Sequence, residues 1–127
     1  MFAVVFVQTA CYIIVGAIAA RISFAGFLLA EVCMGAIIYP IYGNWVWGGG
    51  WLSQLGEKNL GNGYLDFAGS GVVHAIAGWT ALAGAMVCGP RLRKYNSAGS
   101  TNAIQGHHVA LDLFGCFLLA FGCVVLN

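Results

Sequence analysis

Residues 66–90 read DFAGSGVVHAIAGWTALAGAMVCGP, and their composition is that of a membrane-spanning helix. No Asp, Glu, Lys or Arg follows Asp66 before Gly89-Pro90, a pair that commonly ends a helix. An α-helix rises about 1.5 Å per residue, so a helix of this length crosses a hydrocarbon core about 30 Å thick. We therefore predict a transmembrane helix over residues 66–88.

The composition of the whole chain supports a membrane protein. Hydrophobic types make up 61% of the 127 residues and charged types 7%, against roughly 45–50% and about 25% in soluble domains. A soluble domain of this size cannot bury so much apolar surface, which excludes an ordinary cytosolic enzyme. The net charge is only +1, and the chain lacks the basic stripe of a nucleic-acid-binding protein. The expected surroundings are the lipid bilayer, with no nucleic acid as partner.

Three further apolar segments are predicted to cross the membrane. The first ends at Arg21, the second contains Glu31 and ends near Pro40, and the last has Asp112 near its start. The predicted fold class is all-α, a polytopic transmembrane helical bundle with about four helices, at residues 2–20, 24–42, 66–88 and 109–127. Because the outer two segments lack polar flanks, we interpret residues 1–127 as part of a single larger membrane domain, incomplete at both ends.

Basic residues predict the orientation in a cell membrane. The loops at residues 21–23 and 89–108 share a side when the chain crosses four times, and they hold Arg21, Arg91, Arg93 and Lys94. The opposite loop, residues 43–65, holds only Lys58. Cytoplasmic loops carry the excess of Lys and Arg, so loops 21–23 and 89–108 are predicted to be cytoplasmic and loop 43–65 to be outside.

Within residues 66–88, His74 is the residue that most suggests function. Small side chains surround it and favour close packing of membrane helices: Ala75, Ala77, Gly78, Ala81, Ala83, Gly84 and Ala85. His74 lies eight residues past Asp66, about 12 Å deeper along a helix. An ionisable group at that depth usually marks a pathway. The alternative is a core histidine whose ring is satisfied by a backbone carbonyl.

Asp66 and Trp47 also have two interpretations each. Asp66 is placed where a helix N-cap belongs, and a carboxylate there satisfies free N–H groups. The same carboxylate at an outer mouth favours a cation just outside it. Trp47 precedes three glycines and either walls a vestibule or anchors the chain at the interface, the role we favour for Trp45 and Trp51.

The remaining polar residues indicate no enzyme and no metal centre. Glu31 is costly in lipid and is expected to be neutral, paired or at a subunit contact. His107, His108 and Asp112 have metal-ligand spacing, but a polar loop entering a helix needs no metal. Most of the five cysteines (Cys11, Cys33, Cys88, Cys116 and Cys123) lie in apolar runs and are expected to act as small hydrophobic residues. No nucleophile–base pair is present, so no catalytic residue and no cofactor is predicted.

The motifs around Asp66 resemble those of the ammonium transporter (Amt/Mep/Rh) family. The resemblance is carried by residues 66–70 (DFAGS) with His74, and by YP at 39–40 followed by WVWGGG at 45–50. Residues 1–21 look like the family's helix that supplies a pore phenylalanine. The ending at residues 121–127 is similar to a later pore helix. The chain thus resembles roughly the third to sixth of eleven helices.

The resemblance implies a homotrimer in which each protomer has its own pore. By position, Trp47 and Phe6 would bind ammonium at the outer site, with Asp66 supporting it. Phe6 would also close the outer gate, and His74 would be the first of two pore histidines. The implied partners are ammonium or ammonia, and a cytosolic regulatory partner is compatible with this assignment.

The sequence also departs from the family pattern. Leu126 is in the place of a second gate phenylalanine, which leaves the two-ring gate open to question, although Leu126 would still line the pore. Asn44 replaces a common histidine, and Ala20 replaces the usual acid before Arg21. The loop from Trp51 to Leu65 is longer than usual, and the second pore histidine belongs to a later helix.

The chemistry predicts transport of the neutral species. Dehydrating a small cation in a low-dielectric site costs far more than the roughly 0.5–2 kcal/mol of a cation–π contact. Ammonium escapes this cost by losing a proton, whereas potassium cannot. The predicted path is recruitment as ammonium, deprotonation near the mouth and passage of ammonia beside His74. The alternatives are an ammonium-sensing membrane domain and an inactive truncated fragment.

Overall fold

The computed structural model describes residues 2–56 and 61–126, so Lys58 and Asn127 lie outside the described residues. The chain forms two compact units, Met1–Arg91 and Leu92–Asn127. The helical elements are α1 (Phe2–Ile18), α2 (Phe24–Cys33), η1 (Met34–Ile38), α3 (Tyr39–Val46), η2 (Ser70–Ala75), α4 (Ile76–Cys88) and α5 (Val109–Leu126). No β-strand occurs within the described ranges. The all-α membrane fold is therefore confirmed.

Among residues 2–56 and 61–126, three continuous helices are long and apolar enough to cross a membrane. They are residues Phe24–Val46, Ser70–Cys88 and Val109–Leu126. Helix α1 has 17 residues and so spans about 25 Å, somewhat less than a hydrocarbon core of about 30 Å. It ends two residues earlier than the expected Ala20, because Ala20 has a φ of 59°, which a right-handed helix does not allow.

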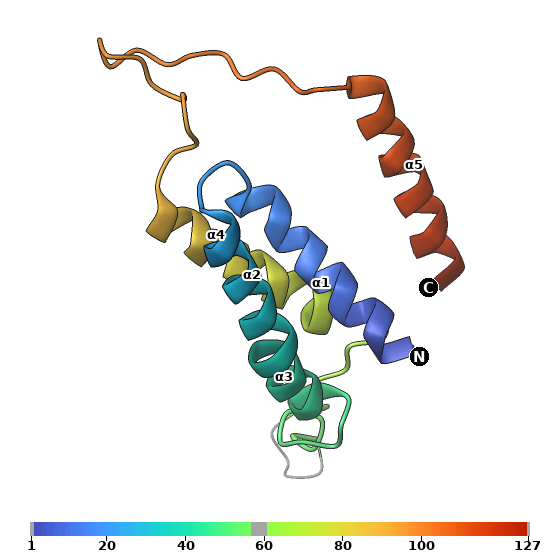
Figure 1. Ribbon diagram of the computed structural model, residues 1–127. Helices are drawn as coiled ribbons and strands as arrows, with labels where there is room; N and C mark the ends of the chain where they lie inside the picture. The colour runs from blue at the N-terminus through green and yellow to red at the C-terminus, as the bar shows by residue number, and fades with distance from the viewer. Residues whose placement is uncertain (1, 57–60, 127) are drawn as a thin grey trace. The chain divides into compact units, whose positions relative to one another are not determined.

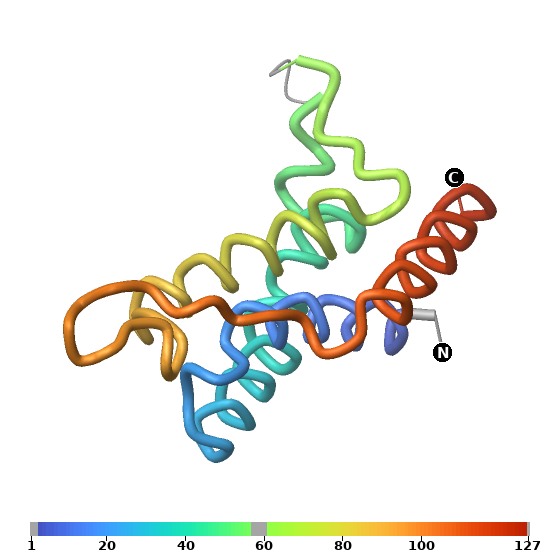
Figure 2. Tube along the Cα trace, turned by 90° about the horizontal axis from the view of Figure 1, so that it is seen from above, coloured from blue at the N-terminus to red at the C-terminus, as the bar shows by residue number. Residues whose placement is uncertain are grey.

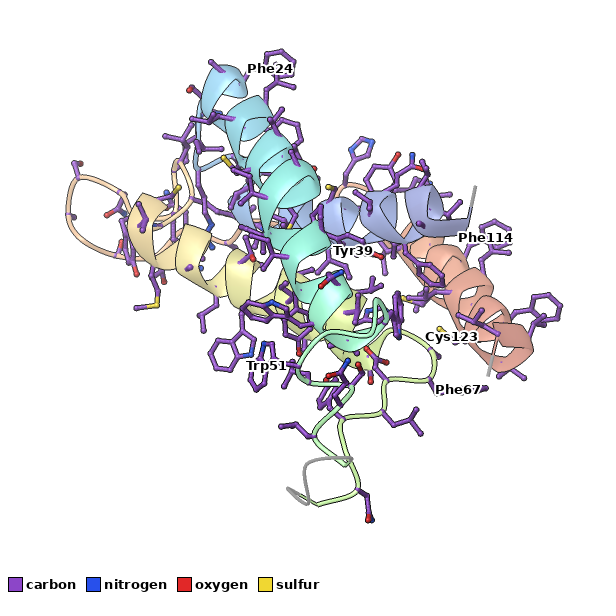
Figure 3. The ribbon with its side chains drawn as sticks, turned by 90° about the horizontal axis from the view of Figure 1, so that it is seen from below. Phe24, Tyr39, Trp51, Phe67, Phe114 and Cys123 are labelled. Atoms are coloured by element: carbon purple, nitrogen blue, oxygen red, sulfur yellow. The ribbon has the colours of Figure 1, made fainter. Side chains whose placement is uncertain are left out.

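The second helix continues to Val46, past Pro40 and past the predicted end at residue 42. A π-helical segment, η1, directly precedes α3, and the N–H of Tyr39 donates to the carbonyl of Met34. Proline has no N–H and its ring collides with the carbonyl four residues back. The wider π-turn accommodates this defect, so the helix reaches Val46. Figure 3 shows Phe24 at one end of this helix, Trp51 just beyond the other end, and Tyr39 between them.

Helices α1 and α4 run side by side in the same direction, and the α2–η1–α3 helix crosses them (Figures 1 and 2). Ala10, Ile14 and Ile18 form the buried stripe of α1, at intervals of four residues. Helix α4 contributes the small residues Ala77 and Ala81. This is the close packing that the small residues of this segment predicted.

Gly84 of α4 lies against Ile18 of α1, and this contact gives a test of the packing. A Cβ atom at Gly84 would lie 2.7 Å from Cγ2 of Ile18, whereas a Cβ at Gly78 meets nothing within 4 Å. Gly84→Ala is expected to lower the free energy of unfolding by about 1–3 kcal/mol. Gly78→Ala is the matched control and should be neutral or slightly stabilising. Unfolding of the full-length protein by SDS in mixed micelles measures both, and equal effects would contradict this packing.

Candidate functional site

The Asp66 carboxylate organises the start of the η2–α4 helix. Asp66 is only 4% exposed. Its Oδ1 accepts hydrogen bonds from the N–H of Gly69 at 2.8 Å, and from the N–H and hydroxyl of Ser70 at 2.9 and 3.2 Å. Its Oδ2 accepts from the N–H of Gly71 at 2.9 Å and of Val72 at 2.7 Å. One side chain thus satisfies backbone donors that a helix start leaves without partners.

Asp66 performs this role from outside the helix, which corrects the expected helix start. The helix begins at Ser70, and the N-cap residue is Gly69, with φ 89° and ψ 21°. A side chain at Gly69 would be strained, and its Cβ would lie 2.9 Å from Cγ2 of Val73. A side chain at Gly71 would displace Tyr64, because a Cβ there would lie 2.0 Å from the Tyr64 hydroxyl oxygen. These two glycines let the chain fold around the carboxylate.

The Asp66 carboxylate carries a negative charge at neutral pH. Burial raises the pKa of Asp66, but the hydrogen bonds from the N–H groups of Val72, Gly69 and Gly71 and from the Ser70 side chain lower it by more. The pKa therefore lies below its ordinary value, because each of these donors favours the ionised form. The helix start supplies further positive potential from its dipole.

Trp47 connects this carboxylate segment to α1. Trp47 is the C-cap residue of α3, and its indole Nε1–H donates to the backbone carbonyl of Asp66 at 2.7 Å. Its ring centroid lies 5.5 Å from that of Phe6, with the planes tilted by 59°. Trp47 is 41% exposed. The structure thus brings Phe6, Trp47 and Asp66 together from three separate parts of the first unit.

His74 lies within η2 on the exposed surface of the first unit. Its backbone N–H donates to the carbonyl of Gly69 at 3.0 Å. Because the helix begins at Ser70, His74 is about 6 Å into the helix, not the 12 Å estimated from Asp66. Leu126 ends α5 in the second unit and is 44% exposed.

Tyr64 and Tyr42 adjoin the site and were not singled out from the sequence. The Tyr64 hydroxyl fills the space beside Gly71, and the Tyr42 hydroxyl donates to it at 3.5 Å, a long contact. The only sequence signal was the glycine at position 71. Trp45 contacts Tyr42 and Trp51 edge-on, with ring centroids 6.3 and 5.8 Å apart.

The other polar residues have local roles. Glu31 lies near Cys11, and its Oε1 is buried and has no hydrogen-bond partner among the described residues. His108 caps α5, because its Nδ1 accepts the N–H of Leu111 at 3.1 Å. Within residues 2–56 and 61–126 there is no cluster of three or more potential metal ligands.

Comparisons with known proteins match the whole chain. The family model described as Ammonium Transporter Family matches residues 1–127. The chain is 52% identical to "Ammonium transporter Amt2" of Archaeoglobus fulgidus over 99% of its own length and 28% of that protein. It is 41% identical to "Ammonium transporter Amt1" of Methanocaldococcus jannaschii over 98% of its length and 30% of that protein. It is 39% identical to "Ammonium transporter 1 member 2" of Oryza sativa over 88% of its own length and 23% of that protein.

The chain spans between 23% and 30% of the length of these curated relatives. No solved structure matches it.

Proposed function

Because the chain belongs to the ammonium transporter family, we propose that the protein containing it conducts ammonia across a cell membrane after recruiting ammonium at an outer site. Phe6 and Trp47 bind the cation, Asp66 supports them, and His74 borders the path of the neutral molecule. Phe6 also closes the outer gate, and the family resemblance implies that Leu126 is a pore-lining residue. The homotrimer and a cytosolic regulatory partner belong to this proposal, because the family resemblance implies them.

The observation that carries the proposal is the connection Phe6–Trp47–Asp66. Two tilted rings 5.5 Å apart present aromatic faces to a cation, a contact worth about 0.5–2 kcal/mol. The buried negative charge of Asp66 lies in the residue that holds the Trp47 indole at 2.7 Å. Aromatic faces and a fixed anion both favour a cation over a neutral guest. Ammonium is therefore the form that binds.

Recruitment and passage require different chemistry. The cation–π contact is too weak to offset dehydration of an ion in an apolar conduit, so the proton has to leave. A neutral imidazole both accepts and donates hydrogen bonds, which suits it to ammonia and to relaying a proton. His74 lies in the same η2 segment whose first N–H groups bind Asp66. The η2 segment therefore carries both the N–H groups that bind the supporting carboxylate and the imidazole.

The orientation follows from the basic residues. Arg21 and Arg91 both follow the ends of helices that run in one direction, so their loops share a side. We assign loops 21–23 and 89–108 to the cytoplasm and loop 43–65 to the outside, because cytoplasmic loops carry the excess of basic residues. Phe6, Trp47 and Asp66 then face the outside, where a recruited cation arrives.

Trp47→Leu in the full-length protein tests the recruitment site. The KM for methylammonium uptake is expected to rise about 2- to 30-fold, the equivalent of one lost cation–π contact. The measurement is uptake of labelled methylammonium by cells that lack other ammonium transporters.

The matched control is Trp45→Leu, which removes an indole from the same helix but from the Tyr42–Trp51 side. Its KM should remain unchanged. An unchanged KM for Trp47→Leu, or an equal rise in both variants, would contradict the assignment of the site.

A further inference from the structure

Two arginines tie the ends of α1 and α4 to each other. Arg21 follows α1, and its guanidinium donates a hydrogen bond to the carbonyl of Gly89, the C-cap residue of α4. Arg91 follows α4, and its Nη2 donates at 3.2 Å to the carbonyl of Gly16 in the last turn of α1. Each helix end is therefore capped by an arginine from the segment that follows the other helix.

The electrostatics explain why both positions carry arginine. The last carbonyls of a helix have no partners within it and form the negative end of its dipole. Because α1 and α4 run in the same direction, two such negative ends lie next to each other. The approach is close there, since a Cβ at Gly84 would lie 2.7 Å from Ile18. Two guanidinium groups offset the repulsion and satisfy the carbonyls.

The reciprocal arrangement resists sliding in both directions. If α1 moved along α4 toward its own N-terminus, Arg21 would be drawn away from Gly89. If α1 moved the opposite way, the Gly16 carbonyl would be drawn past Arg91. A single arginine would oppose only one of these displacements. The pair therefore fixes the axial register of α1 against α4.

We infer that Arg21 and Arg91 are positioning residues for the outer site, because the register they fix keeps Phe6 beside Trp47. Phe6 lies ten residues before Gly16 on the same helix, about 15 Å away. A slip of α1 by one turn moves Phe6 by about 5.4 Å, as much as the 5.5 Å that separates the Phe6 and Trp47 rings. The transport consequence of this inference rests on the proposed function.

A disulfide between positions 18 and 84 reports the register without any transport measurement. In the native register a Cβ at position 84 lies 2.7 Å from Cγ2 of Ile18, so cysteines at positions 18 and 84 are close enough for a disulfide. In the full-length protein, Arg21→Gln/Arg91→Gln is expected to slow oxidation of this pair about tenfold, as judged by mass spectrometry of the linked peptides. An unchanged rate would overturn the inference, whatever the outcome for Trp47.

Uptake then shows whether the register governs the site. Arg21→Gln/Arg91→Gln should raise the KM for methylammonium about tenfold with kcat little changed, and each single variant should raise it about threefold. Oxidised Ile18→Cys/Gly84→Cys should restore the KM in the double variant, whereas the reduced form should not. A restored KM separates positioning from a general loss of stability, because the disulfide holds α1 and α4 in register without restoring the positive charges.

The control is Arg93→Gln, which removes an equal charge two residues beyond Arg91 and should leave the KM unchanged. A KM rise of the same size in Arg93→Gln would overturn the inference in favour of surface charge. Failure of the disulfide to restore the KM would overturn it too. If the glutamine variants do not accumulate, Arg21→Lys/Arg91→Lys keeps both donors and should retain the native oxidation rate, while Arg21→Lys/Arg91→Met should not.

Discussion

Replacing Asp66 by alanine is expected to lower the free energy of unfolding by about 3–5 kcal/mol and to abolish methylammonium uptake. The substitution leaves the N–H groups of Gly69, Ser70, Gly71 and Val72 without their acceptor in a buried turn. Each unsatisfied buried donor costs about 1–3 kcal/mol before relaxation. The carbonyl that holds Trp47 belongs to the same residue, so the aromatic site loses its support together with the helix start.

The measurements are SDS-induced unfolding in mixed micelles and uptake by cells with the full-length protein. Asp112→Asn is the matched control, since Asp112 lies in the first turn of α5 and is exposed. A carboxylate in that position contributes less than about 1 kcal/mol through the helix dipole. If Asp66→Ala lowers the free energy of unfolding no more than Asp112→Asn does, the Asp66 carboxylate does not stabilise the turn.

The same carboxylate sets the sign of an acid dependence. The pKa of Asp66 is lowered in the folded state, burial raising it and the four donors at residues 69–72 lowering it by more. Its stabilisation is therefore complete above the unfolded pKa of about 4 and is lost as the pH falls through the folded value. The free energies of unfolding of the parent protein and of Asp66→Asn should become equal at pH values below the folded-state pKa of Asp66. A difference that persists undiminished in acid would contradict the assignment.

The sequence predicted the function of Asp66 in capping but not its position. An aspartate before an apolar run predicts a helix start at once. In the structure the chain first turns through Gly69 in the left-handed region, and the carboxylate reaches back over the turn. The conformation depends on contacts with Val73 and Tyr64, side chains that no local pattern connects to Gly69 and Gly71. Local propensity therefore predicted that the Asp66 carboxylate binds free N–H groups at a helix start. Tertiary packing determined at which residue that helix begins.

At Pro40 the sequence predicted a helix end that the structure does not have. Proline predicts the end of a helix because it lacks a donor, and the prediction of residue 42 as the last residue relied on this rule. The helix tolerates Pro40 because the preceding turn widens at η1, and Met34 and Tyr39 from this region are buried in the core. Burial of these side chains outweighs the local defect. Only the assembled helices supply that burial, so the sequence alone could not show it.

The family motifs predicted which residues form the site, while the bonds between them came from the structure. Phe6 and Trp47 were assigned by resemblance, and their rings lie in contact. The link from the Trp47 indole to the Asp66 carbonyl involves a backbone atom, which leaves no trace in the sequence. The arginine exchange between Arg21 and Arg91 was missed for the same reason, since both acceptors are backbone carbonyls.

His74→Ala is expected to lower the kcat of methylammonium uptake about a hundredfold while leaving its KM nearly unchanged. Alanine neither accepts nor donates a hydrogen bond, so the neutral amine loses its partner on the path and the proton loses a relay. The recruitment site is expected to remain intact in this variant, because the Phe6–Trp47 ring contact and the hydrogen bond from the Trp47 indole to the Asp66 carbonyl are made without His74. Uptake at several methylammonium concentrations separates the two constants.

The contrast between His74→Ala and Trp47→Leu tests the division between binding and passage. A group that acts only in recruitment changes KM, and a group that acts only on the moving species changes kcat. His107→Ala removes an imidazole from the exposed loop before α5 and should change neither. Unchanged uptake and unchanged selectivity over potassium in His74→Ala would remove His74 from the path. Transport of potassium by His74→Ala would instead show that the imidazole helps to exclude ions that cannot lose their charge. Potassium can pass only through a conduit that accepts a charged ion.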